Sequence, residues 1–272
     1  MQKHRPLTLQ ATIGLPTVGD EPSDLIRGFI HLVRLYRPFD EIFVGLWNKS
    51  MLDCSTRQLA HLQHQHEEAL PMDLQTTETQ AADLRTSQQW LRIMVWQLSI
   101  SKGFLSSASP DTCMTFRYPI EIAKDLVTVT GRLSQQSMEV HSIDLVSSIY
   151  LAKVQILTIL QIEKVFDVTC TLIDVMACVP IQPRNFELGP QDYLNQLLTL
   201  ISTLRGGDSR YISLVRAKIS ETLPNMGPSI TQPLPLMVPG HYNKDLKDES
   251  TPSSTSSSPM SSPPFMHYYL LA

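Results

Sequence analysis

The sequence predicts an all-α fold, and three observations lead to that prediction. Apolar residues recur at the helical period in several segments, and proline or glycine stands where these patterns stop. Alternating strand patterns joined by turn dipeptides are absent from the sequence. A chain of 272 residues can bury one sizeable core and still have tails. We therefore expect a helical domain over residues 21–224, after an extended segment over 1–20 and before a tail over 225–272.

The first three helices are expected over residues 22–36, 39–48 and 54–69. Ser23 is a candidate cap of the first helix. That helix is indicated by apolar residues at helical spacing, namely Leu25, Ile26, Phe29, Ile30, Val33 and Tyr36. The third is polar along its length.

The longest helix is expected over residues 76–106. Its exposed face should be formed by Glu78, Asp83 and Arg85. Its buried face should be formed by Leu84, Trp90, Leu91, Met94, Val95 and Leu98. Trp90 and Trp96 could line a small-molecule pocket, but core packing explains two helical tryptophans more simply.

Four further helical regions follow. Pro119 suits the first position of a helix that ends near residue 129. Another helix should run from Gln135 into residues 146–161 and resume at Ile162. The last two helices are expected over residues 193–204 and 209–223. Beyond them the chain is rich in proline and serine, so 225–272 should be disordered.

Charge and cysteine content limit the function. The net charge is −4, and no basic stripe suited to DNA or RNA is present, so we expect no direct DNA binding. The four scattered cysteines, Cys54, Cys113, Cys170 and Cys178, form no CxxC pair, which argues against a zinc ribbon or a disulfide framework. Cys170 and Cys178 lie in a helical pattern and should act as small core residues.

One histidine-rich segment deserves weighing as a metal site. His61, His64 and Glu68 could share one face of a helix, and imidazole with carboxylate suits zinc. The spacing is not HExxH and the neighbours are polar, so a solvated helix face is the preferred interpretation, and we expect neither a metal nor a cofactor in this chain.

Two other patterns are explained without a ligand. Residues 204–210 contain Gly206-Gly207 but lack the P-loop spacing, and a glycine helix stop explains them. Residues 143–162 are apolar over the length of a membrane span, but Asp144, Lys153 and Gln155 lie inside, so no span is expected. No GxSxG elbow is present, and we assign no catalytic residue and expect no enzyme.

Several segments together resemble a known family. They are QQWLRIMVWQLSISKGFLSS, CMTFRYPIEIAKDLV, SQQSMEVH, IEKVFDVTCTLIDVMACVP and LGPQDYLNQLLTLISTLRGGDSRY. In this order they resemble the C-terminal region of fungal zinc binuclear cluster transcription factors, most closely the amylolytic (starch and maltose) activators. The likeness extends over residues 5–224.

The resemblance implies a nuclear transcription regulator whose helical region responds to an inducer and contacts other regulators or the transcriptional machinery. The six-cysteine zinc cluster that reads DNA in this family is absent, so metal and DNA binding do not carry over. We therefore expect the regulatory part alone, controlling genes of starch or carbohydrate use. The alternatives are a regulator of a secondary-metabolite gene cluster and a stand-alone helical binding module.

Residues 146–161 interrupt the family pattern, which passes from SMEVH almost directly to IEKVFDV. Joining Leu145 to Ile162 places Met138, Leu145 and Ile162 on one helical face. Val146-Ser147 can be encoded as the donor GTA-AGT, Leu157-Thr158 as a branch point and Gln161 as the acceptor CAG. A retained intron is the preferred interpretation, and a natural insertion is the alternative.

The interruption has a predicted physical consequence. As continuous helix, sixteen residues would add about 24 Å and turn the following segment by roughly 160°. The two halves could then not both keep their packing, and a looped-out segment would expose many apolar side chains. We expect the full chain to be less stable than a chain that lacks residues 146–161.

Overall fold

A computed structural model describes residues 23–49, 53–139, 151–180, 188–204 and 210–224, with the side chains of 41 and 151–160 excepted. All of these residues belong to the first of two units, Met1–Ile230 and Thr231–Ala272. The expected extended segment 1–20 and tail 225–272 lie outside the described residues. Within these ranges every regular element is a helix, which confirms the all-α prediction.

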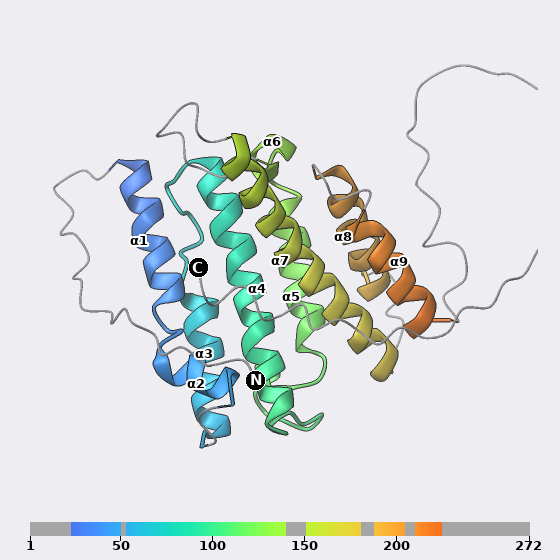
Figure 1. Cartoon of the computed structure of the whole chain (residues 1–272). Helices are drawn as coiled ribbons and strands as arrows, with labels where there is room; N and C mark the ends of the chain where they lie inside the picture. Colours follow the sequence, from blue (N-terminus) through green and yellow to red (C-terminus); the bar gives the residue numbers. More distant parts are fainter. Residues whose placement is uncertain (1–22, 50–52, 140–150, 181–187, 205–209, 225–272) are drawn as a thin grey trace, which may run out of the picture. The chain divides into compact units, whose positions relative to one another are not determined.

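The helices follow one another in a simple order (Figure 1). They are α1 (Asp24–Tyr36), α2 (Glu41–Trp47), α3 (Thr56–Glu68), α4 (Glu78–Ser101), a 3₁₀ turn η1 (Thr112–Met114), α5 (Tyr118–Thr130), α6 (Gln135–Glu139), α7 (Leu151–Cys178), α8 (Pro190–Thr203) and α9 (Tyr211–Thr222).

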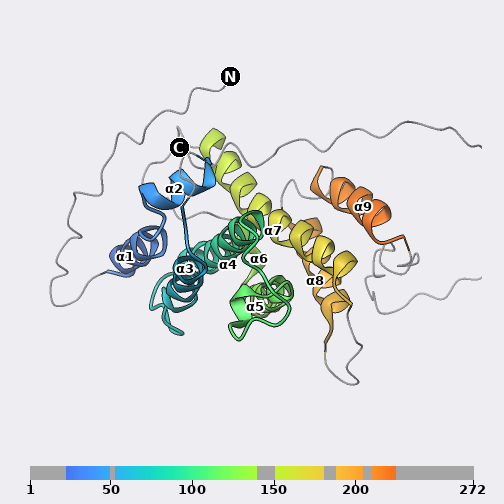
Figure 2. The same ribbon diagram turned by 90° about the horizontal axis from the view of Figure 1, so that it is seen from below.

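Helix α4 is the centre of the packing. It contacts α1, α3, α5, α6 and α7, and Figure 2 shows these helices grouped around it. Every residue from Thr86 to Trp96 is buried, so α4 has no wide solvent face in this stretch. The expected apolar side of α4 is confirmed. Asp83 and Arg85, however, are half-buried rather than exposed. Asp83 forms an ion pair with Lys164 of α7, and Arg85 donates to the carbonyls of residues 71 and 72.

Both ends of α4 have a local cause. Thr77 and Gln80 form a capping box at the start, which satisfies free backbone N–H groups. The helix ends at Ser101 and not near residue 106 as expected. Gly103 adopts a left-handed φ of 72°, a conformation that glycine takes without strain and that stops a helix.

Helices α5 and α7 flank α4 and run in opposite senses along it. Trp96 donates to the Thr115 carbonyl at one end of α4, and Ser134 donates to Glu78 at the other, so α5 is antiparallel to α4. Helix α7 is parallel to α4, because Gln161 donates to the Ala82 carbonyl and further contacts advance along both helices. Helices α8 and α9 pack on the other side of α7 (Figure 2).

Most of the apolar residues from which α1 was predicted are not the residues that α1 buries against the rest of the protein. Leu25, Ile26, Phe29 and Tyr36 are exposed, whereas the side toward α4 contains Gly28, His31 and Leu35. A Cβ on Gly28 would overlap the Gln80 amide, so glycine permits this close approach of α1 to α4. The apolar side of α1 in the sequence therefore faces outward.

Most other boundaries agree with the sequence to within a few residues. Ser55 and Gln58 form a capping box at the start of α3. Pro119 is the second residue of α5, one position later than expected. All four cysteines are free, but Cys178 is exposed at the last position of α7 and so is not the core residue that we expected, whereas Cys113 is buried.

Helix α7 includes residues 151–161 and continues without a break through Ile162 to Cys178, so the helix does not resume at Ile162 but is already under way there. Ser134 contacts Glu78 and Gln161 contacts Ala82, only one turn further along α4. A straight helix joining Ser134 to Gln161 would span about 40 Å. The two halves are therefore not one straight helix, so the condition under which we predicted a loss of packing by rotation is not met.

Candidate functional site

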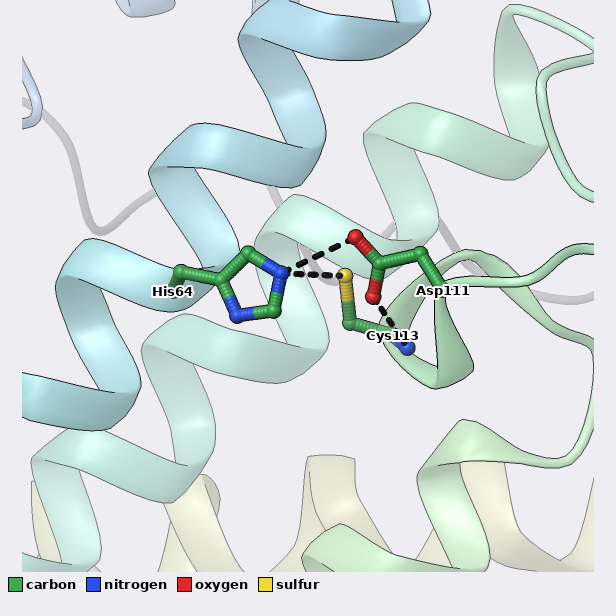
Figure 3. A group of neighbouring side chains, drawn as sticks. All are labelled: His64, Asp111 and Cys113. Atoms are coloured by element: carbon green, nitrogen blue, oxygen red, sulfur yellow. Dashed lines mark hydrogen bonds and ion pairs between the residues drawn. The ribbon is translucent and has the colours of Figure 1, made fainter.

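Three polar side chains from distant parts of the sequence converge at one end of α3 and the η1 turn (Figure 3). His64 Nε2 lies 2.9 Å from Asp111 Oδ2 and 3.9 Å from Cys113 Sγ. The three candidate ligand atoms all lie within 4.8 Å of one another. Figure 3 shows the imidazole edge pointing toward the carboxylate and the thiol.

The backbone of the α4–α5 connection fixes two members of this His64–Asp111–Cys113 group. Asp111 caps the 3₁₀ turn, because its Oδ1 accepts from the Cys113 N–H at 3.3 Å. The Asp111 N–H is in turn bonded to Ser109 Oγ. One carboxylate oxygen thus orients the turn, while the other remains directed at His64.

Glu67 contacts the other nitrogen of the His64 imidazole. Its Oε2 lies 3.5 Å from His64 Nδ1, one turn along α3. The hydrogen bond to Asp111 raises the pKa of His64, with smaller contributions from Glu67. Burial opposes ionisation of Asp111, but its bonds to Cys113 and His64 outweigh burial and lower the pKa of this carboxyl.

The chemistry open to this group follows from its charges. Burial, then the neighbouring Asp111 and Glu67, raise the pKa of the Cys113 thiol, so it is not an activated nucleophile. Imidazole, carboxylate and sulfur together match the ligand set of borderline-soft cations such as Zn²⁺. The group is thus suited to holding a cation and not to covalent catalysis.

The three residues first considered for a metal site do not form one group. His61, His64 and Glu68 all lie on α3 and are exposed, which confirms the solvated face. Among the described residues, His64 is grouped with Asp111 and Cys113 instead. Sequence reasoning missed those two because they lie 47 and 49 residues away along the chain.

A second polar cluster surrounds Arg92, whose side chain is only 4% exposed. Its guanidinium donates twice to Tyr118 Oη, at 3.0 and 2.9 Å, and also to Gln89 and to Asp125 Oδ2 at 2.7 Å. Glu67 Oε1 lies 3.6 Å from Arg92 Nη2. The cluster therefore joins α3, α4 and α5 and extends to the Glu67 that contacts His64.

The sequence contains a signal for this cluster. Arg92 is the one charged residue within WLRIMVW, and a charge inside an apolar run is rarely buried unless it is paired. Its hydrogen bonds satisfy the planar guanidinium on several sides. The cluster is best explained as a buried structural network.

No family model, curated protein or solved structure matches this chain. The family resemblance noted in the sequence therefore stays a prediction.

His66 is the buried histidine of the HLQHQHEE segment. It has no exposed surface, and its ring lies 4.7 Å from that of Phe39. Within the described part of the chain, neither ring nitrogen has a hydrogen-bond partner. Burial, with a smaller effect of Arg92, lowers the pKa of His66 to about 4, so the ring is neutral in the folded protein near pH 7.

Polar pairs also line the contact between α4 and α7. Lys164 Nζ lies 2.9 Å from Asp83 Oδ1 and 2.7 Å from Ser87 Oγ. Trp90 Nε1 donates to Asp167 Oδ2 at 2.9 Å. Burial raises the pKa of Asp167 to about 6, although the bond from Trp90 opposes that shift. These pairs fix the register of the two helices.

The remaining candidates are resolved as follows. Trp90 and Trp96 are both buried and hydrogen-bonded, which confirms the core interpretation. Residues 205–209 and 143–150 lie outside the described residues, so the glycine turn and the start of the candidate membrane span are not described. Among the helices that are described, none is long and apolar enough to cross a membrane.

Proposed function

We propose that this chain is the regulatory part of a fungal-type transcription regulator. It acts in the nucleus through contacts with other regulators or the transcriptional machinery, under control of an inducer of starch or maltose use. The main support is the ordered resemblance over residues 5–224, which includes segments on every helix from α4 to α8 and reaches the first residue of α9.

The packing of those segments supports treating them as one functional unit. The helices that contain the resembling segments contact one another, as α4 does α5, α6 and α7, and as α7 does α8 and α9. Resembling segments scattered over unrelated surfaces would not need to share a core. Here Ile122 of α5, Met138 of α6, Val165 of α7 and Leu197 of α8 are all buried.

The outward side of α1 supports a function in protein contact. Leu25, Phe29 and Tyr36 are 47%, 52% and 36% exposed and lie along one side of the helix. An amphipathic segment of a partner regulator has the matching chemistry, since its apolar side fits the strip.

A tethering experiment tests the proposal. The full chain is fused to an unrelated DNA-binding domain, and a reporter with the matching operator is measured in a filamentous fungus, with and without maltose or starch. We expect the fusion to change reporter expression and the sugar to alter that change. Reporter expression equal to that of the DNA-binding domain alone, under every condition, would contradict the proposal.

A further inference from the structure

We propose that His64, Asp111 and Cys113 form a binding site for Zn²⁺. The inference goes beyond the regulatory function and does not rest on it. The ion would be held by His64 Nε2, Asp111 Oδ2 and Cys113 Sγ, and water would complete the coordination on the exposed side of His64.

Two separations within the group, both from His64 Nε2, are close to those around a tetrahedral ion. Usual Zn–N, Zn–O and Zn–S bond lengths give separations of about 3.3 Å between nitrogen and oxygen and about 3.6 Å between nitrogen and sulfur. The observed separations are 2.9 Å for His64 Nε2 to Asp111 Oδ2 and 3.9 Å for His64 Nε2 to Cys113 Sγ. Shifts of a few tenths of an ångström reconcile the two, and His64 is exposed enough to move.

The surroundings of the imidazole match those of a metal ligand. A metal-binding histidine usually presents its other nitrogen to a carboxylate, which fixes the ring and strengthens the ligand. Glu67 occupies that position, 3.5 Å from His64 Nδ1. Arg92 lies 3.6 Å from the other oxygen of Glu67, so this carboxylate is itself held.

The rigidity of the thiol and carboxylate also favours a site. Cys113 is 1% exposed, and its N–H donates to Oδ1 of Asp111, two residues earlier. Ser106 donates to the Met114 carbonyl, which fixes the same turn from the other side. The turn that holds both ligands is thus formed before an ion arrives, and the exposed His64 can adjust.

The ligand types select among cations. Sulfur and imidazole are poor ligands for Mg²⁺ and Ca²⁺, which prefer oxygen. Binding of Zn²⁺ releases the proton of the Cys113 thiol and any proton on His64 Nε2 to water. The bound ion would join α3 to the α4–α5 connection, next to the Arg92 cluster.

The experiment uses the purified full chain after chelation and removal of the chelator. Zn²⁺ is titrated in competition with a chromophoric chelator, and Co²⁺ is added to a second sample as a spectroscopic probe. We expect one high-affinity ion per chain, a sulfur-to-Co²⁺ charge-transfer band and the visible bands of tetrahedral Co²⁺. Mg²⁺ should not compete.

Variants assign the ligands. His64→Gln should weaken Zn²⁺ binding at least about tenfold, Glu67→Gln should weaken it about tenfold through the imidazole, and Cys113→Ser should remove the charge-transfer band. His61→Gln and Cys178→Ser are matched controls at exposed positions and should leave affinity and spectrum unchanged. Circular dichroism checks that each variant is folded, and His64→Gln serves if Cys113→Ser is not.

The outcomes are distinct. Equal affinity for the full chain and folded His64→Gln would overturn the proposal, as would a Co²⁺ spectrum without a sulfur band. The proposal would also be overturned if the full chain bound Zn²⁺ no more tightly than the double variant that combines His61→Gln with His64→Gln. Success or failure of the tethered reporter does not enter this result.

Discussion

Two hydrogen bonds, of 3.0 and 2.9 Å, join the Arg92 guanidinium to the Tyr118 hydroxyl and connect the middle of α4 to the first residue of α5. Burial raises the pKa of Tyr118 to about 12, so the hydroxyl stays neutral and accepts from the arginine. Asp125 and Gln89 accept hydrogen bonds from Nη1 of Arg92. Tyr118 is therefore the acceptor for N–H groups on the other two guanidinium nitrogens, which are buried.

Tyr118→Phe should therefore destabilise the protein by about 1–3 kcal/mol, since it leaves buried N–H groups without an acceptor. Urea unfolding followed by circular dichroism measures this change. Tyr36→Phe removes a hydroxyl from an exposed position and should change the free energy of unfolding by less than about 0.5 kcal/mol. Equal effects of the two substitutions would show that the hydrogen bonds between Arg92 and Tyr118 do not contribute to stability.

Asp167 should limit stability at neutral pH. Its pKa is about 6 in the folded protein and near 3.8 without burial, so the folded state binds the extra proton and stability falls as pH rises from about 4 to 6. Asp167→Asn keeps an acceptor for Trp90 and should raise the free energy of unfolding by about 1–3 kcal/mol at pH 8, but not near pH 4. A gain of equal size at both values would contradict this origin.

His66 should act in the opposite sense over a similar range. Its pKa is about 4 in the folded protein and 6.5 when exposed, so the unfolded state takes up a proton first and stability falls as pH drops from about 6.5 to 4. His66→Leu should flatten this decline and be more stable than the parent at pH 5 by about 1–3 kcal/mol. Thermal melts from pH 4.5 to 7.5 measure it.

The control for His66→Leu is His61→Leu, an exposed position on the same helix. It should leave the acid decline as it is. A decline that persists unchanged in His66→Leu would mean that another group is responsible.

The chain lacking residues 146–161 should melt at a higher temperature than the full chain. Leu145 would then replace Gln161, which is 1% exposed and whose Oε1 has no partner among the described residues. Six residues would connect Glu139 to Ile162, a reach of about 20 Å, and α6 already contacts α7. Gln161→Leu in the full chain tests the same position and should match or exceed the parent in stability.

If the full chain were as stable as the chain lacking residues 146–161, or more stable, the prediction about the deletion would be wrong. Sequencing the transcript across the codons of Leu145 and Ile162 tests the intron directly. A transcript in which residues 146–161 are always encoded would leave a natural insertion as the explanation.

Helical periodicity located the helices because it depends on neighbours in the sequence, and it succeeded for α3, α5, α8 and α9. It could not tell which side of α1 is buried. Gly28 and His31 face α4 because Gly28 leaves room for the Gln80 side chain of α4, and the sequence of α1 alone does not reveal that contact. It also missed the end of α4, where the positive φ of Gly103 outweighs the apolar residues that follow.

The candidate site was predicted only in part. His64 was considered from its own helix, and its exposure was expected. Asp111 and Cys113 could not be assigned to it, because their approach depends on how the α4–α5 connection folds against α3. The buried role of His66 likewise follows from its place between Phe39 and Arg92, which spacing within α3 does not reveal.

The tethered reporter, read with one pair of variants, tests the proposed regulatory function most directly. Phe29→Glu places a charge on the outward apolar strip of α1, and Leu214→Glu places one on an exposed apolar position of α9. We expect the tethered chain to change reporter expression in a sugar-dependent way, Phe29→Glu to abolish that change, and Leu214→Glu to preserve it. A tethered parent chain that leaves the reporter unchanged in every sugar would contradict the account.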